Sequence, residues 1–243
     1  MKNFSVKTLL VAAIISLMGG SVLQVSAAEV KNNEGQTYQS EAKYNFAEEV
    51  TTFSDLGCMS RALEAYVAEN PESTEAEQEA FLIQFVESGG LRAARSSRGI
   101  GDYIPGYGSL NSAERELALK HPIQAVTVYN CANKATDATI AYYGTNGWQD
   151  NSDAFRHCCW NALMKSAMSA SDADAWATAH EAESSGIDKD MDLFNNAVGR
   201  SINVSGKSDS EIYEAVKGKV KGGSCRRIVD NKLVATDGTG LIK

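Results

Sequence analysis

The sequence predicts a mainly α fold: a helical domain of about five to seven helices with a small C-terminal β-hairpin. Apolar residues recur three and four positions apart over most of the chain after residue 50, which is the spacing of one helix face. Two capping boxes, Thr74-x-x-Glu77 and Ser208-x-x-Glu211, mark helix starts. Two short β-type runs, Arg227–Val229 and Leu233–Val234, flank an Asp-Asn turn and indicate either a hairpin or one strand followed by loose chain.

Residues 1–28 have the pattern of a secretory signal peptide. Lys2 and Lys7 precede an apolar run from Leu9 to Met18, and small residues lead to Ala28. This run is shorter than an ordinary membrane span, and no later segment approaches about 18 uninterrupted apolar residues. We therefore expect a secreted or extracytoplasmic protein with no membrane span in the mature chain.

Charge and cysteine content restrict the function further. The net charge of −8 and the scattered basic residues argue against a nucleic-acid partner, because phosphate binding needs a basic surface. The five cysteines form no CxxC pattern, which argues against a zinc–thiolate site. Cys158 and Cys159 are neighbours on a predicted helix, so a bond between them would be strained. Either one could instead pair with Cys131 or Cys225.

The part before residue 109 divides into two predicted segments. Residues 29–52 are polar and lack periodicity, which is typical of a flexible leader. Residues 53–95 predict a helical hairpin, with one helix from Phe53 to Val67 and a second that starts at the Thr74 box and ends at Gly89-Gly90. A Gly-, Pro- and Arg-rich stretch from Arg95 to Ser109 is the predicted domain boundary.

Residues 109–243 form the predicted motif-bearing domain. One helix starts at Ser112, and the next starts at Pro122 and stops at Gly144. Three helices follow over residues 153–170, 172–184 and 191–203, with Ser152 as the cap of the first. The Ser208 box opens a last amphipathic helix, which ends at Gly222-Gly223.

Polar residues of unusual type gather on the three helices between residues 153 and 203. Residues three and four apart share a helix face, so Asp153, Arg156, His157 and Trp160 form one stripe. The next helix carries a second stripe with these members: Trp176, His180 and Glu183 or Ser184. The short connection predicts an antiparallel pair, in which a Trp–His layer and a His/Arg–carboxylate layer stack in one groove.

The third helix adds a further polar stripe to this predicted groove. Its members fall at i, i+3, i+4, i+7 and i+8: Asp192, Asn195, Asn196, Gly199 and Arg200. Asparagine is a poor residue for a helix interior, so the two adjacent ones indicate side-chain hydrogen bonding across a buried groove. Gly199 leaves room for another backbone or a ligand.

Three interpretations of this constellation stay open. In the first, His157 and His180 bind a divalent metal such as zinc with Asp192, Glu181 or Glu183, although no HExxH motif is present. In the second, a histidine held by a carboxylate is a general base without a metal, and Arg156 or Arg200 stabilises negative charge. In the third, the residues form a structural or partner-binding network.

The function expected from these alternatives is a secreted hydrolase, possibly metal-assisted, that acts on an envelope, lipid or phosphoester substrate. The metal set is His157, His180 and Asp192, and Glu181, Arg156 and Arg200 complete the catalytic group. The residues expected in contact with substrate are Trp160, Glu183, Asn195 and Asn196. The alternative is a non-catalytic secreted binding protein with a structural polar groove. The sequence does not identify a partner.

Three motifs in order resemble an uncharacterised bacterial domain. They are DAFRHxxW at residues 153–160, AHE at residues 179–181 and MDLxNNxxGR at residues 191–200. Similar domains occur in secreted bacterial proteins and at the ends of polymorphic toxins, and the similarity covers about residues 109–203. The resemblance implies a shared site and, through the toxin association, a hydrolase of envelope components or lipids. Cys158-Cys159 departs from the pattern.

Overall fold

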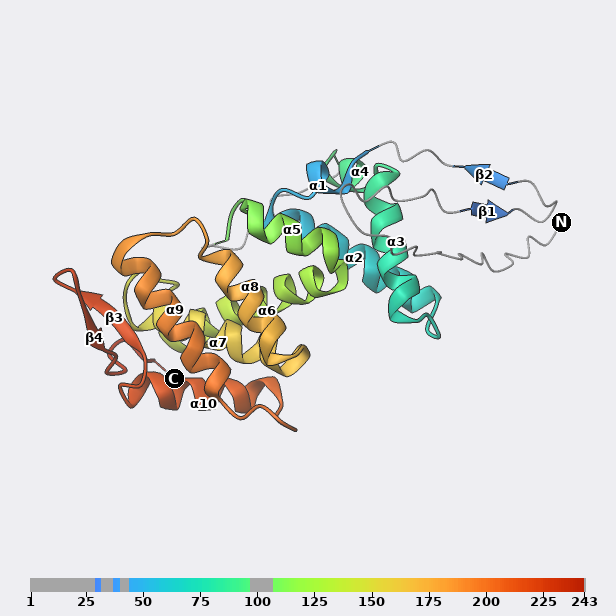
Figure 1. Cartoon of the computed structure of the whole chain (residues 1–243). Helices are drawn as coiled ribbons and strands as arrows, with labels where there is room; N and C mark the ends of the chain where they lie inside the picture. Colours follow the sequence, from blue (N-terminus) through green and yellow to red (C-terminus); the bar gives the residue numbers. More distant parts are fainter. Residues whose placement is uncertain (1–28, 32–36, 40–43, 97–106, 243) are drawn as a thin grey trace.

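The computed structural model describes residues 29–31, 37–39, 44–96 and 107–242. These residues form ten helices and two small antiparallel sheets, so the predicted mainly α fold with a C-terminal hairpin is confirmed (Figure 1). The predicted signal peptide and most of the predicted boundary segment lie outside the described residues. Within the described parts, no helix is long and apolar enough to cross a membrane.

The N-terminal part contains two short strands and four helices. Its elements are β1 (Glu29–Lys31), β2 (Thr37–Gln39), α1 (Phe46–Glu49), α2 (Phe53–Glu69), α3 (Glu75–Glu87) and α4 (Gly90–Ser96). The predicted capping box of Thr74 and Glu77 is present at the start of α3. Phe46 and Val50 are buried, so the chain is already part of the core within the segment expected to be a flexible leader.

Buried acidic residues hold this N-terminal part together. The side chains of Glu49 and Asp55 are almost fully buried and pair with Arg92 and Arg95 of α4. Asp55 also accepts from the backbone N–H of Thr52, which closes a capping box at the start of α2. Unpaired buried carboxylates would be costly, so these arginines fix α4 against α1 and α2.

Six helices and a hairpin make up the remainder. They are α5 (Ser112–Lys120), α6 (Pro122–Tyr143), α7 (Asn151–Ala167), α8 (Ala170–His180), α9 (Gly186–Ser201), α10 (Asp209–Lys221), β3 (Arg226–Val229) and β4 (Lys232–Ala235). Pro122 is in the first turn of α6, and Gly144 ends it with a φ of 71°. The hairpin pairs Arg226 with Ala235 and Val229 with Lys232.

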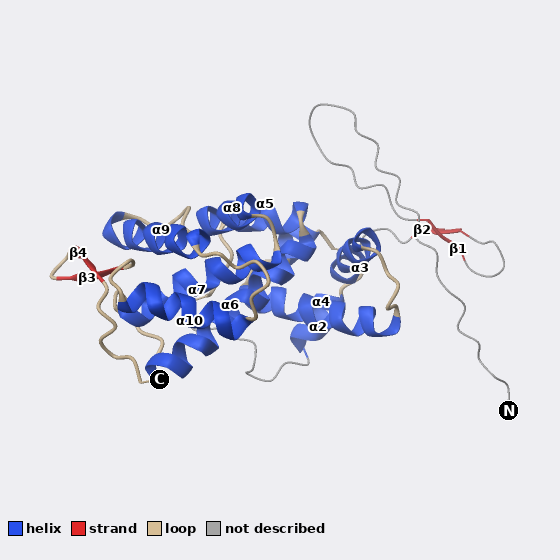
Figure 2. Cartoon of the chain, turned by 90° about the horizontal axis from the view of Figure 1, so that it is seen from below, coloured by secondary structure: helices blue, strands red, loops and turns tan. Residues whose placement is uncertain are grey.

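Helix α7 is the centre of this part. Every residue from Asn151 to Met164 is buried, as expected for a helix that is apolar around much of its circumference. It packs against α6, α8, α9 and α10, and Figure 2 shows it inside the bundle, between α9 on one side and α10 on the other. Polar groups on α7 therefore need partners from these neighbours.

Helices α7 and α9 lie unusually close together at Gly199. A Cβ atom at this position would stand 2.2 Å from the carbonyl oxygen of Cys158 and 2.9 Å from Cβ of Asn161. The glycine predicted to permit a close approach therefore meets the backbone of α7.

Several helix ends differ from the sequence prediction, among them the start of α9, which was expected at about Met191 and lies at Gly186. Helix α7 begins at Asn151, because the side chain of Asp150, and not that of Ser152, accepts from the first free N–H groups. Helix α8 ends at His180 and α9 begins at Gly186, so Glu181 and Glu183 lie in a connection. Turn hydrogen bonds from Ala182 to Ala179 and from Ser184 to Glu181 replace the predicted last helical turn.

All five cysteines are buried, and no disulfide joins them in the described part of the chain, so neither possible pairing of Cys158 or Cys159 is formed. The thiol of Cys158 interacts with that of Cys225, and this contact and burial raise the pKa of Cys158 well above its usual value. A thiolate is the reactive form of cysteine, so this change reduces the reactivity of the residue beside His157.

Candidate functional site

Asp153, His157 and Asp192 bring three potential metal ligands together. Nε2 of His157 lies 3.5 Å from Oδ1 of Asp153 and 3.4 Å from Oδ1 of Asp192. One ligand atom from each residue lies within 4.8 Å of the others. Asp153 and His157 share a face of α7 at i and i+4, and Asp192 comes from α9, so the tight packing of these two helices builds the group.

Contacts from two sides fix Asp153. Its Oδ2 accepts from the backbone N–H of Gln149 at 2.6 Å, and its Oδ1 accepts from the guanidinium of Arg156. Gln149 has a φ of 61°, a conformation uncommon for a side chain larger than glycine, and its amide also donates to Asp188 at 2.5 Å. The loop before α7 therefore orients the first ligand.

Glu181 stands on the opposite side of His157. Its Oε1 lies 4.0 Å from Nδ1 of His157, and the residue is 1% exposed. It belongs to the connection after α8, so three elements converge on one imidazole. The distance of 4.0 Å is too long for a hydrogen bond, so Glu181 faces the second ring nitrogen without bonding to it.

The charges of the group are not balanced. Burial first, and then the charge of Arg156, lower the pKa of His157 well below its usual value, so the ring is neutral near pH 7. The group then holds the guanidinium of Arg156 and three carboxyl groups, of which Asp153 and Glu181 are buried and Asp192 is 17% exposed. Burial first, and then Asp153 and Glu181, raise the pKa of Asp192 to about 8. Asp192 is therefore protonated near pH 7 without a cation, and a divalent cation would favour its ionised form.

Several buried polar atoms around this group have no hydrogen-bond partner. They are Oη of Tyr107, Nε of Arg156, Nδ1 of His157, Oε1 of Glu181, Oδ1 of Asp192 and Nδ2 of Asn196. Buried polar atoms are nearly always paired in folded proteins, so a cluster of exceptions indicates a site for an ion, water or ligand. The donor set of one imidazole and two carboxylates fits a divalent cation.

His180 does not join this group, although it was expected as a ligand. Its Nδ1 lies 2.7 Å from Oε1 of Glu114, and its ring packs against Phe53, Tyr107 and Trp160. The reason is the early end of α8, which turns His180 toward α5 and leaves Glu181 facing His157. The structure thus places Asp153 where the sequence analysis expected His180.

Of four other expected site residues, three have packing roles in the structure and one is exposed. Trp160 is fully buried and donates to the carbonyl of Val128. Both amide atoms of Asn195 bond to the backbone of Arg226 at 2.8 Å, which fixes the hairpin. Arg200 binds Asn161 at 2.6 Å and pairs with Asp174 at 2.6 Å. Glu183 is exposed on the connection after α8.

Asn196 connects the packing network to the candidate site. Its Oδ1 accepts from Asn161 at 2.7 Å, while its Nδ2 is one of the unpaired buried atoms. The expected hydrogen bonding across a buried groove holds for Asn196, whereas Asn195 bonds to the hairpin.

The sequence pattern places Asp153 on the correct helix stripe but does not identify it as a ligand. Nor does it identify Tyr107 or Glu114 as neighbours of the site. The i and i+4 spacing of Asp153 and His157 was a usable signal. Tyr107 and Glu114 precede the three motifs by about 40 residues, and no local pattern indicates that they fold against His180 and Arg156.

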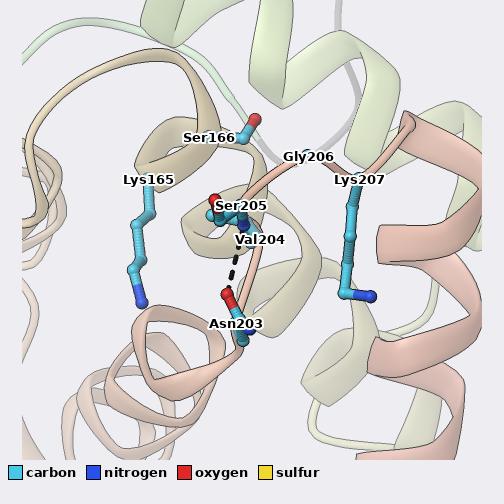
Figure 3. Close-up of a pocket in the computed structure, with 7 residues that line it drawn as sticks. All are labelled: Lys165, Ser166, Asn203, Val204, Ser205, Gly206 and Lys207. Atoms are coloured by element: carbon cyan, nitrogen blue, oxygen red, sulfur yellow. Dashed lines mark hydrogen bonds between the residues drawn. The ribbon is translucent and has the colours of Figure 1, made fainter.

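Two surface hollows lie away from this group. The first, of about 410 Å³, is formed by the end of α7 and the loop between α9 and α10 (Figure 3). Lys165 lines it but donates to the carbonyls of Arg200 and Ile202, so this ammonium satisfies the end of α9. The second, of about 250 Å³, is lined by residues of the loops around Asn151 and Thr239. Neither hollow includes the candidate ligands.

Comparison with known families gives one match. A family model described as a domain of unknown function (DUF6973) matches residues 115–224. A DUF6973 domain is therefore found in this chain. The domain includes all three candidate ligands and the three motifs, which agrees with the expected likeness to an uncharacterised domain. No curated protein and no solved structure matches the chain.

Proposed function

We propose that this protein is an exported, metal-assisted hydrolase whose cation is held in the DUF6973 domain by Asp153, His157 and Asp192. The observation that carries the proposal is the convergence of these ligand atoms within 4.8 Å, beside buried polar atoms that have no partner. The export of the protein rests on the signal-like pattern of residues 1–28.

One imidazole and two carboxylates leave coordination positions open, as in catalytic zinc sites. A divalent ion in such a site polarises a substrate oxygen and lowers the pKa of bound water. Glu181 faces the His157 ring from its Nδ1 side, and Gln149 and Arg156 would hold Asp153. These contacts keep the ligands in place without using the ligand atoms of His157 and Asp192.

The unpaired donors favour a substrate with an anionic oxygen. Nε of Arg156 and Nδ2 of Asn196 are buried and have no acceptor. A phosphoester or an acyl group that develops negative charge would supply one. This agrees with an envelope, lipid or phosphoester substrate.

One observation favours a second candidate, a binding protein whose cation is structural. Asp153, His157 and Glu181 are each less than 5% exposed, and only Asp192, with 17% of its side chain exposed, reaches solvent. A structural ion needs no path for a substrate, whereas a catalytic one does.

Hydrolysis of defined substrates distinguishes the candidates. Chelator-treated protein would be reloaded with Zn²⁺ or Mn²⁺ and incubated with p-nitrophenyl esters, bis(p-nitrophenyl) phosphate and anionic phospholipid vesicles. The proposal predicts metal-dependent turnover that falls about 100-fold or more in Asp192→Asn. Asp190→Asn, an exposed carboxylate on the same helix, is the matched control. Stoichiometric metal without turnover of any substrate would support the structural role instead.

A further inference from the structure

A second imidazole–carboxylate pair lies next to the candidate metal centre. Nδ1 of His180 is 2.7 Å from Oε1 of Glu114, and the two side chains are 18% and 3% exposed. His180 ends α8, whereas Glu114 lies in the first turn of α5, so tertiary packing makes the pair.

Both partners are held in place. The second carboxylate oxygen of Glu114 accepts from the backbone N–H of Asn111 at 2.8 Å. The amide of Asn111 donates to the carbonyls of Ala179 and His180, which ties the end of α8 to α5. Phe53, Tyr107 and Trp160 surround the His180 ring at centroid distances of 5.9, 5.4 and 5.1 Å. The imidazole therefore has little freedom to turn.

This arrangement leaves the other ring nitrogen available. With Nδ1 directed at a carboxylate, the favoured neutral tautomer carries its proton on Nδ1 and a lone pair on Nε2. Within the described part of the chain, no hydrogen bond or ion pair engages Nε2. The His180 side chain is 18% exposed, so it is not fully enclosed by the core.

Tyr107 and Arg156 connect the pair to the candidate metal centre. The ring of Tyr107 lies 5.4 Å from that of His180, and the guanidinium carbon of Arg156 lies 5.6 Å from the Tyr107 ring. Arg156 in turn binds the ligand Asp153. His180 is also the chain neighbour of Glu181, which faces His157.

We propose that His180 is the general base of the proposed hydrolysis and that Glu114 is the positioning residue that holds it. The inference rests on the proposed function. Nε2 takes a proton from the attacking water as the water oxygen bonds to the substrate carbon or phosphorus, and the same proton then passes to the departing oxygen. The sum is one water consumed and one ester bond cleaved, with no oxidant or reductant required.

The first test needs no substrate. Glu114→Gln removes the charge but keeps the helix cap, because glutamine serves equally at the third position of a capping box. Glu116→Gln, whose carboxylate is 66% exposed on the same helix, is the matched control. Histidine ¹⁵N spectra at pH 7.5 give the tautomer. Carbethoxylation by diethyl pyrocarbonate, located by peptide mass spectrometry, gives the reactivity of Nε2.

We expect His180 to carry its proton on Nδ1 and to be acylated, with the exposed His121 as internal reference and the buried His157 unreactive. Glu114→Gln should slow acylation of His180 about tenfold, and Glu116→Gln should not change it. A proton on Nε2, or an acylation rate that Glu114→Gln leaves at the wild-type value, would overturn the inference.

The second test uses metal-loaded protein with bis(p-nitrophenyl) phosphate. Glu114→Gln should lower kcat about 10- to 100-fold while KM and metal stoichiometry stay at wild-type values. An unchanged kcat would overturn the assignment of His180 as the base without contradicting the proposed hydrolase activity. If the wild-type protein is inactive, both the proposed hydrolase activity and the assignment of His180 as its base are wrong. This holds even if the tautomer and the acylation rates are as expected.

Discussion

Asp192 is the carboxylate through which the candidate centre reaches solvent. Its pKa is raised to about 8, first by burial and then by the negative charges of Asp153 and Glu181. A bound cation would reverse this effect, because it favours the ionised carboxylate. Burial beside two other carboxylates thus makes ionised Asp192 unfavourable in the metal-free protein, and the same surroundings favour binding of a cation.

Asp192 should make the metal-free protein less stable as the pH rises. The folded state keeps the carboxyl proton up to about pH 8, whereas the unfolded chain releases it from about pH 4. Stability present below pH 4 is therefore lost progressively as the pH rises to about 8. Asp192→Asn should remove this loss, which is on the order of several kcal/mol, since the pKa rises by about four units and one unit is about 1.4 kcal/mol.

Urea unfolding at pH 5 and pH 8.5 in the presence of a chelator measures this difference. Asp190→Asn is the control, because Asp190 is an exposed carboxylate on the same helix as Asp192. If the free energy of unfolding changes equally with pH in wild type and Asp192→Asn, the pKa of Asp192 is not raised in the folded protein.

At the residue scale, the sequence indicated much of the candidate site. The motifs predict helical spacing and antiparallel packing, and these bring four of the expected residues together: Arg156, His157, Glu181 and Asp192. The expected layer of Trp160 with His180 is confirmed, since their ring centroids lie 5.1 Å apart. The contact of His180 with α5 was not readable, because it depends on where α8 stops and on which side chain of α5 lies opposite. Glu114 and Tyr107 are far from the motifs in sequence, so only tertiary structure identifies them.

At the element scale, the contact of α7 with α9 holds the candidate ligands in register. Asp153 and His157 come from one helix and Asp192 from the other, and Gly199 is where the two backbones meet. The hydrogen bonds of Asn161 with Asn196 and Arg200 lie at the same contact. A change of the interhelical distance should therefore alter both stability and metal binding.

Gly199→Ala tests this contact. The new Cβ would meet the Cys158 carbonyl at 2.2 Å, so the helices must separate, at a cost of about 2–4 kcal/mol. Gly218→Ala on α10 is the matched control, because no atom lies within 4 Å of its Cβ. That change should stabilise the protein by about 0.5–1 kcal/mol through helix propensity. Denaturant unfolding measures both, and a neutral Gly199→Ala would contradict the close approach.

Helix ends were predicted where local chemistry alone determines them. The capping boxes at Thr74 and Ser208, proline at the start of α6 and Gly144 at its end are confirmed. The ends of α7 and α8 were wrong by two to four residues. There, Asp150 competes with Ser152 as the cap, and α8 stops once the Asn111 side chain binds its last carbonyls.

At the scale of the whole molecule, the N-terminal helices pack on the domain that holds the candidate site. Helices α2 and α3 contact α6, and α1 contacts α5. Phe53 at the start of α2 also contacts the ring of His180. The segment before the matched domain therefore contributes to the environment of the candidate base.

Metal binding should stabilise the entire fold, because α7 and α9 are central to it. A cation at about 100 times its Kd would add about 2.7 kcal/mol to the free energy of unfolding. Differential scanning calorimetry should show a higher Tm with Zn²⁺ or Mn²⁺ and a return to the original value with chelator. His157→Gln should remove the increase, whereas His121→Gln, at the exposed junction of α5 and α6, should keep it.

The central claim is that Asp153, His157 and Asp192 hold one divalent cation, and metal stoichiometry tests it most directly. Equilibrium dialysis followed by elemental analysis should give one ion per chain for wild type and Asp190→Asn, and none for Asp192→Asn. Equal metal content in all three proteins, or no metal in any of them, would contradict the account.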